Sequence, residues 1–78
     1  MITPAEVLNL ISDNLLDLPR NFPTDGNLFH EGLDSMGIMQ LVLLVEQEFQ
    51  ITLEPTDLDQ QHFETAESFT TLLNKKST

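Results

Sequence analysis

Apolar residues recur at helical spacing in three stretches of the chain. In the first stretch the apolar positions are Val7, Leu8, Ile11, Leu15 and Leu18, which fall on one face of a helix. Thr3 can cap this helix, Pro4 suits its first position, and Glu6 completes a capping box. Because Pro19 and Pro23 cannot continue a helix, the pattern predicts that the first helix ends near Leu18.

The second stretch predicts a helix from Ser35 to about Phe49, with Asp34 as its N-cap. At about 100° per residue, one narrow arc is predicted to face the core. It holds Ile38, Val42, Val45 and Phe49, with Leu41 beside it. Met36, Met39 and Leu43 project from the other side. Closely spaced apolar residues that stay exposed often mark a docking surface, and methionine adapts to several partner shapes.

Some side chains near this helix have two open interpretations. Met39 either belongs to the docking surface or is covered by a further helix, whereas Met36 and Leu43 are expected to be exposed. Leu33 faces either the core or the same docking surface. Gln40 is either part of that surface or a solvated helix position. The segment from Pro19 to Asp34 is rich in turn-forming residues, so a long loop held by apolar anchors is expected before this helix.

The remaining chain predicts two more helices. Ile51 and Leu53 form a short apolar link, and a short helix follows from Pro55 to about His62 with Thr56 as its cap. A last helix starts near Thr65. It has Phe69, Leu72 and Leu73 on its apolar face and Lys75 and Lys76 near its negative end. The fold class is therefore all-α: a small four-helix bundle of three main helices and one short helix, with a long loop between helices 1 and 2.

Composition narrows the classes of function. The 78 residues suit one domain, residues 1–78, with a thin core. Thirteen acidic against three basic residues give a net charge of −10, which opposes binding to nucleic acid and to anionic membranes. No basic leader and no apolar run of roughly 20 residues is present, so we expect a cytoplasmic protein that does not insert into membranes. We expect so short a single chain to be a monomer, with weak self-association through the methionine face as the alternative.

Ser35, in the run Gly32-Leu33-Asp34-Ser35-Met36, is the main candidate for chemistry. Backbone N–H groups and the helix dipole favour a phosphate attached where a helix begins. An enzyme would instead use Ser35 as a nucleophile with His30 or His62 as base. The run is not Gly-x-Ser-x-Gly and the chain is too small to enclose a substrate, so we expect neither catalysis nor a metal site. An unmodified acidic adaptor is the competing class.

This arrangement resembles the acyl and peptidyl carrier protein family. The resemblance rests on Leu28-Phe29, on the run from Gly32 to Met36, and on the helix that ends in Glu46-Gln47-Glu48-Phe49 before Ile51. It implies that Ser35 carries 4′-phosphopantetheine, donated by coenzyme A through a phosphopantetheinyl transferase, and that Asp34 helps to position the serine. The cofactor thiol would hold an acyl or aminoacyl thioester, because this chain has no cysteine.

The subtype is also implied by resemblance. Asp34-Ser35-Met36-Gly37 with Gln40-Leu41 is similar to D-alanyl carrier proteins and other free-standing carriers that adenylate-forming ligases load. Carriers of fatty acid synthesis typically have acidic residues where this chain has Gly37 and Gln40, although fatty acid and polyketide carriers stay open as alternatives. The implied partners are the transferase, an adenylating ligase and a downstream acyl-processing enzyme with a basic surface. They would dock on Leu33, Met36, Met39, Gln40 and Leu43.

Overall fold

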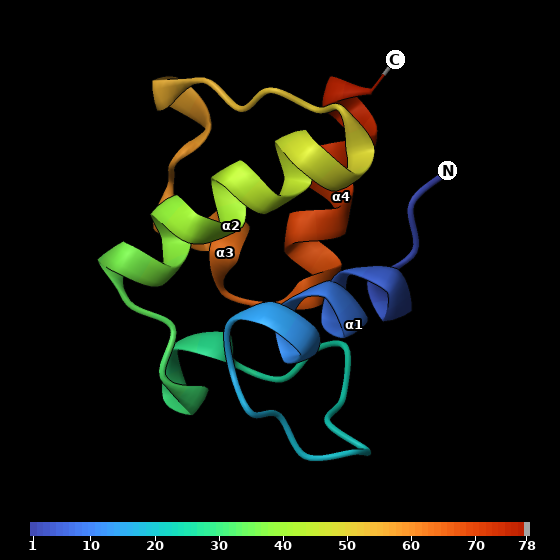
Figure 1. Ribbon diagram of the computed structural model, residues 1–78, viewed down its shortest axis with the longest axis vertical. Coiled ribbons are helices and arrows are strands. Elements are labelled where there is room, and N and C mark those ends of the chain that lie inside the picture. The colour runs from blue at the N-terminus through green and yellow to red at the C-terminus, as the bar shows by residue number, and fades with distance from the viewer. Residues whose placement is uncertain (78) are drawn as a thin grey trace.

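The computed structural model describes residues 1–77, which form four α-helices, two short 3-10 helices and no strand (Figure 1). In chain order the elements are α1 (Pro4–Asn14), η1 (Leu28–Glu31), α2 (Ser35–Phe49), η2 (Pro55–Asp57), α3 (Gln60–Phe63) and α4 (Ala66–Lys76). The predicted all-α class, with three longer helices and one short helix, is confirmed.

Helix α1 begins as predicted but ends earlier. Thr3 Oγ1 accepts a hydrogen bond from the Glu6 N–H, and the Glu6 carboxylate accepts one from the Thr3 N–H. The prediction that the helix continues to Leu18 is wrong, because it ends at Asn14. There the Asn14 side-chain amide donates to the Leu10 carbonyl at 2.9 Å. The N–H groups of Leu15 and Leu16 both donate to the Ile11 carbonyl, at 2.8 and 3.0 Å, so the regular helical bonding pattern ends here. Pro19 also disfavours helical backbone at the residue before it.

The long loop after α1 is fastened to the start of α4. The Leu28 N–H donates to the Glu64 carbonyl at 2.8 Å, and the Glu67 N–H donates to the Thr24 carbonyl at 3.1 Å. Leu28 itself is fully buried. These contacts fix the loop at both its middle and its end, so the residues that follow it enter α2 from a defined position.

The core is built around α4, which approaches the backbones of α1 and α3 most closely. The rings of Phe63 and Phe69 pack with their centroids 5.0 Å apart. From α2 the fully buried side chains are Leu41 and Val45, whereas Ile38, Val42 and Phe49 are only half-buried. The core-facing arc of α2 is therefore centred closer to Leu41 than predicted, because the bundle covers only a narrow stripe of this outer helix.

The link after α2 buries Ile51 and Leu53, as predicted. The short helix predicted from Pro55 to His62 is instead divided into η2 and α3, and the prediction of Thr56 as its cap is wrong. Asp57 Oδ2 accepts from the Glu54 N–H at 2.8 Å and Asp59 Oδ1 accepts from the Gln61 N–H at 3.1 Å. The Asp57 side chain thus holds the start of η2, and the Asp59 side chain caps the start of α3.

The last helix starts at the predicted place and holds two other segments. Thr65 caps α4 through a bond from the Ser68 N–H. Near its other end, Lys76 forms ion pairs with Asp57 at 2.9 Å and with Glu54 at 3.3 Å. The Asn74 side chain exchanges two hydrogen bonds of 3.0 Å with the backbone of Ile2. The carboxyl half of α4 therefore holds both η2 and the start of the chain.

Within residues 1–77, no helix has both the length and the apolar character that crossing a bilayer requires.

Candidate functional site

The turn before α2 is set by a glycine and by a bond back to η1. Gly32 has φ = 114°, a left-handed conformation that glycine adopts without steric cost. The Leu33 N–H then donates to the Leu28 carbonyl at 3.1 Å. The Asn27 side chain holds η1 in place by accepting hydrogen bonds from the N–H groups of Phe29 and His30. Asp34 therefore follows a rigid segment of the chain.

Asp34 caps α2, as the sequence predicts. Its Oδ1 accepts a hydrogen bond from the Gly37 N–H at 2.8 Å, and its backbone carbonyl accepts from the Ile38 N–H at 2.9 Å. The next N–H groups, those of Ser35 and Met36, have no carbonyl within the helix to bond to, as at any helix start. They add to the positive end of the helix dipole beside the Ser35 hydroxyl.

Ser35 is exposed at the first position of α2. Among residues 1–77, neither His30 nor His62 forms a hydrogen bond with it, and His62 Nδ1 instead lies 2.9 Å from the Asp57 carbonyl oxygen. The hydroxyl thus faces solvent beside a helix start, without a general base of its own. This geometry suits a hydroxyl that is modified by another protein.

Gly37 allows the first turn of α2 to lie directly over Leu33. A Cβ at position 37 would be 2.9 Å from Leu33 Cδ1, closer than Cβ atoms normally approach, whereas its distance of 3.4 Å to Asp34 Oδ1 would be an ordinary contact. Leu33 is 4% exposed, so of its two interpretations the structure supports the core position. The turn at Gly32 directs the Leu33 side chain inward, so the docking surface described below does not include it.

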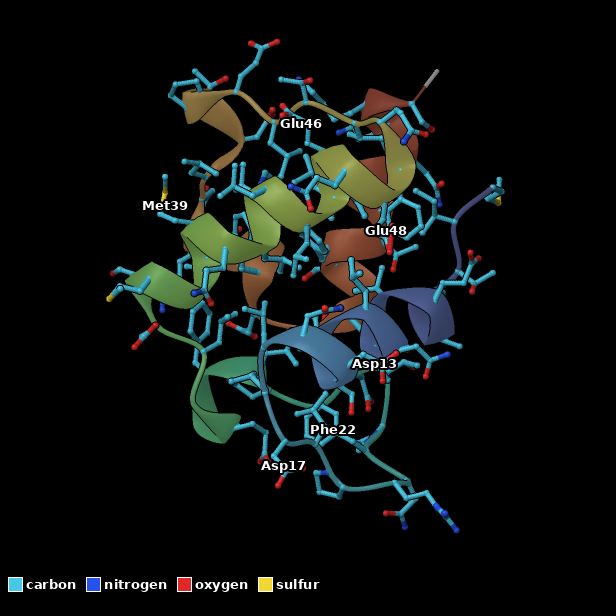
Figure 2. The ribbon with its side chains drawn as sticks, viewed as in Figure 1. Asp13, Asp17, Phe22, Met39, Glu46 and Glu48 are labelled. Atoms are coloured by element: carbon cyan, nitrogen blue, oxygen red, sulfur yellow. The ribbon has the colours of Figure 1, made fainter. Side chains whose placement is uncertain are left out.

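The other predicted docking residues lie together on the outer face of α2. The exposed fractions of Met36, Met39 and Leu43 are 74%, 57% and 59%, and Gln40 is exposed as well. Figure 2 shows the Met39 side chain pointing away from the bundle. With Ser35, these four residues line a surface depression of ≈ 380 Å³. We call Met36, Met39, Gln40 and Leu43 the outer face of α2.

The carboxylates of α2 lie beyond the far end of this face, and none lines its depression. From Ser35 to Val45 the helix carries no charged residue, and the first carboxylates are Glu46 and Glu48 at its far end (Figure 2). Glu48 shares a depression of ≈ 320 Å³ with Glu6 and Asp13 of α1. The result is a neutral, apolar strip with a negatively charged rim.

Two structural features of the site escaped the sequence analysis. The first is η1 with its cap Asn27, which the sequence could have indicated because asparagine often bonds to the backbone two residues later. The second is a depression of ≈ 290 Å³ beside Leu43, where Asn14 of α1 and the following Leu15 meet Gln40 and Gln47. It lies where α1 ends earlier than its apolar spacing predicts.

Comparison with known proteins identifies the family. A family model described as phosphopantetheine attachment site matches residues 5–73. The chain belongs to this phosphopantetheine-attachment family. The cofactor of the family is covalently attached 4′-phosphopantetheine, and the chain is a carrier domain rather than an enzyme.

A solved structure supports the same assignment for this carrier domain. It is the crystal structure of the Bradyrhizobium japonicum glycine:carrier protein ligase complexed with glycylated carrier protein. The similarity has a TM-score of 0.65 and 25% sequence identity, over 88% of this chain and 90% of the other. A search of curated proteins gives no match.

Proposed function

We propose that this carrier domain bears 4′-phosphopantetheine on Ser35 and holds an acyl or aminoacyl group there for transfer between partner enzymes. The observation that carries the proposal is the exposed Ser35 hydroxyl at the capped start of α2, in a chain that matches the attachment family. When bound, the cofactor supplies the thiol for a thioester, which the polypeptide lacks because it has no cysteine.

The residues around Ser35 fit this role. In the attachment step the Ser35 oxygen forms a bond to the phosphorus nearer the pantetheine of coenzyme A. The pyrophosphate bond breaks, adenosine 3′,5′-bisphosphate leaves, and the hydroxyl proton passes to the transferase. Asp34 and Gly37 fix the first turn through their 2.8 Å bond, so Ser35 is presented at a rigid helix start. The N–H groups there favour the new phosphodiester charge.

We further propose that an adenylate-forming ligase loads the carrier with a small amino acid. The similarity to a carrier that is glycylated and in complex with its ligase supports this subtype. The neutral outer face of α2 also supports it, because Gly37 and Gln40 stand where fatty acid carriers typically have acidic residues. Met36, Met39, Gln40 and Leu43 would contact the ligase, the transferase and a downstream acyl-processing enzyme.

The charge pattern specifies what such partners should present. An apolar patch would bury the two methionines and Leu43, which together expose more than half of their side-chain surface. Basic groups around that patch would meet the rim that contains Glu46 and Glu48. The proposal therefore describes partners with an apolar centre and a basic border.

The attachment is tested by intact-mass spectrometry after incubation with coenzyme A and a broad-specificity phosphopantetheinyl transferase. We expect one 4′-phosphopantetheine per wild-type chain and none on Ser35→Ala. Ser12→Ala is the matched control, because Ser12 is an exposed serine within α1, and this variant should be modified as fully as the wild type. An unmodified wild-type chain would favour an unmodified acidic adaptor and contradict the carrier proposal.

A further inference from the structure

The depression on the outer face of α2 is continuous with the proposed attachment residue. Ser35 lines it together with Met36, Met39, Gln40 and Leu43. Ser35 and Met39 are four residues apart, so they lie on the same side of the helix one turn from each other. Of the described depressions, a larger one of ≈ 480 Å³ lies between α1 and the loop that follows it, and Ser35 does not line it.

The chemistry of this surface matches that of the cofactor. Beyond its phosphate, 4′-phosphopantetheine has a carbon with two methyl groups, then a hydroxyl and amide groups, and finally the thiol. Met36, Met39 and Leu43 offer apolar contact to the methyl groups, and methionine side chains adapt to irregular shapes. The Gln40 amide can donate to and accept from an amide. No carboxylate lines the depression, so nothing there repels the phosphate.

The core offers the cofactor no comparable place. Leu41 and Val45, on the inner side of α2, are fully buried, and so are Phe63 and Phe69, whose rings pack against each other. To enter the core, the arm would have to displace buried side chains such as these, which costs several contacts at once. The outer face is already open to solvent.

We infer that the outer face of α2 is the resting site of the carrier's own 4′-phosphopantetheine arm when no partner is bound. The inference rests on the proposed attachment at Ser35. A tethered group has an effective concentration on the order of millimolar, so contacts with a Kd of about a millimolar already keep the site about half occupied. Because partners would use the same face, their docking would displace the arm from the carrier and leave it available to the partner's active site.

The three methionines of this chain make the test direct. With ¹³C-labelled methionine methyl groups, Met36 and Met39 report on the outer face, while Met1 is fully exposed and serves as an internal control. In the free carrier modified with the arm, we expect nuclear Overhauser effects from the geminal methyl groups of the arm to Met36 and Met39. We expect none to Met1, and a shift of the first two methyl signals relative to the unmodified protein.

A matched pair of variants separates a specific site from chance contact. Leu43→Gln should weaken these Overhauser effects, whereas Leu58→Gln should leave them unchanged, because Leu58 is exposed in the segment between η2 and α3 and does not line the depression. Circular dichroism checks that both variants fold. Equal effects of the two variants would contradict the inference.

The remaining outcomes are distinguishable. If mass spectrometry shows the arm but Met36 and Met39 behave as Met1 does, the resting site is wrong and the carrier function stands. Overhauser effects to Phe63 or Phe69 instead would mean that the arm enters the core, which also overturns the inference. If no arm is attached at all, the proposed function fails and the inference fails with it.

Discussion

The exposed position of Ser35 is determined by the three residues that precede it in the chain. Gly32 turns the chain with a positive φ, Leu33 enters the core, and Asp34 caps the helix. Each depends on the one before, because the turn directs Leu33 inward and the buried Leu33 fixes where Asp34 lies. The exposure of the serine follows from this order rather than from any property of the serine itself.

Gly32 offers a direct test of this order. Gly32→Ala should lower the free energy of unfolding by about 1–2 kcal/mol, because an L side chain is strained at this φ. The added methyl group would meet only Leu16 Cδ2 at 3.6 Å, an ordinary contact, so the cost comes from the backbone. Gly32→Asn should cost less, since asparagine tolerates the left-handed region better. Urea denaturation of the wild type and the two variants measures their free energies of unfolding. An alanine variant as stable as the wild type would contradict the role given to Gly32.

The sequence predicted part of this residue-scale arrangement. Asp34 as cap and Ser35 as the first helical residue follow from local chemistry, namely a short acidic side chain before a run that favours helix. The direction of Leu33 could not be predicted in the same way. It depends on the left-handed turn at Gly32 and on the support from η1, which are consequences of the folded loop.

At the scale of the elements, α2 has two faces with different tasks. Its inner stripe, Leu41 and Val45, packs into the core, and its outer face, from Met36 to Leu43, remains uncovered over about two turns. The sequence separated these two sides by helical periodicity alone. The predicted inner arc of α2 was slightly misplaced, because periodicity gives the spacing of a stripe but not which neighbouring helix covers it. The predicted α1 extended to Leu18, because the apolar spacing continues past the Asn14 bond.

The contact of η2 with α4 should depend on pH. The pKa of Asp57 is lowered from 3.8 by the hydrogen bond from the Glu54 N–H and by Lys76, and the pKa of Lys76 is raised from 10.5 by Asp57. A lowered carboxyl pKa stabilises the folded state above the unfolded value, and this stabilisation is lost as the pH falls through the folded pKa. The raised pKa of Lys76 has the opposite dependence, and its contribution is lost only as the pH rises through that value.

Asp57→Asn tests this contribution. We expect the variant to be less stable than the wild type at pH 7 and the difference to be smaller at about pH 2, because the stabilisation is lost as the pH falls through the lowered pKa of Asp57. Lys76→Met should give a similar loss at pH 7, because it removes the partner of the same ion pair. Urea denaturation at the two pH values measures both differences. A difference that persists unchanged in acid would mean that the Asp57 charge does not act here.

At the scale of the whole molecule, charge and apolar surface are separated. A net charge of −10 is spread over 78 residues, yet the outer face of α2 is neutral from Ser35 to Val45. The field of the molecule can thus attract a basic partner from a distance, while the contact itself is apolar. The total charge was evident from the sequence, but the separation became visible only when the fold placed Asp13 of α1 near Glu48 of α2.

This separation predicts how salt affects loading by an adenylate-forming ligase. The KM for the carrier should rise severalfold between about 0.05 and 0.5 M NaCl, because screening shortens the range of the carrier's field. The double variant Glu46→Gln and Glu48→Gln should reduce this salt dependence. Asp25→Asn, in the loop before η1, removes one carboxylate away from α2 and should reduce it less. A salt-independent KM would show that the apolar face alone determines binding.

The positions of the chain ends have a practical consequence. In Figure 1 the start of the chain and the carboxyl end of α4 lie at the same side of the molecule, where Asn74 pairs with Ile2, whereas the amino-terminal end of α2 lies at the opposite side. A tether joined to either end, whether a fusion partner, a bead or a sensor chip, would therefore leave the serine facing outward. The domain is suited to immobilisation in a working orientation.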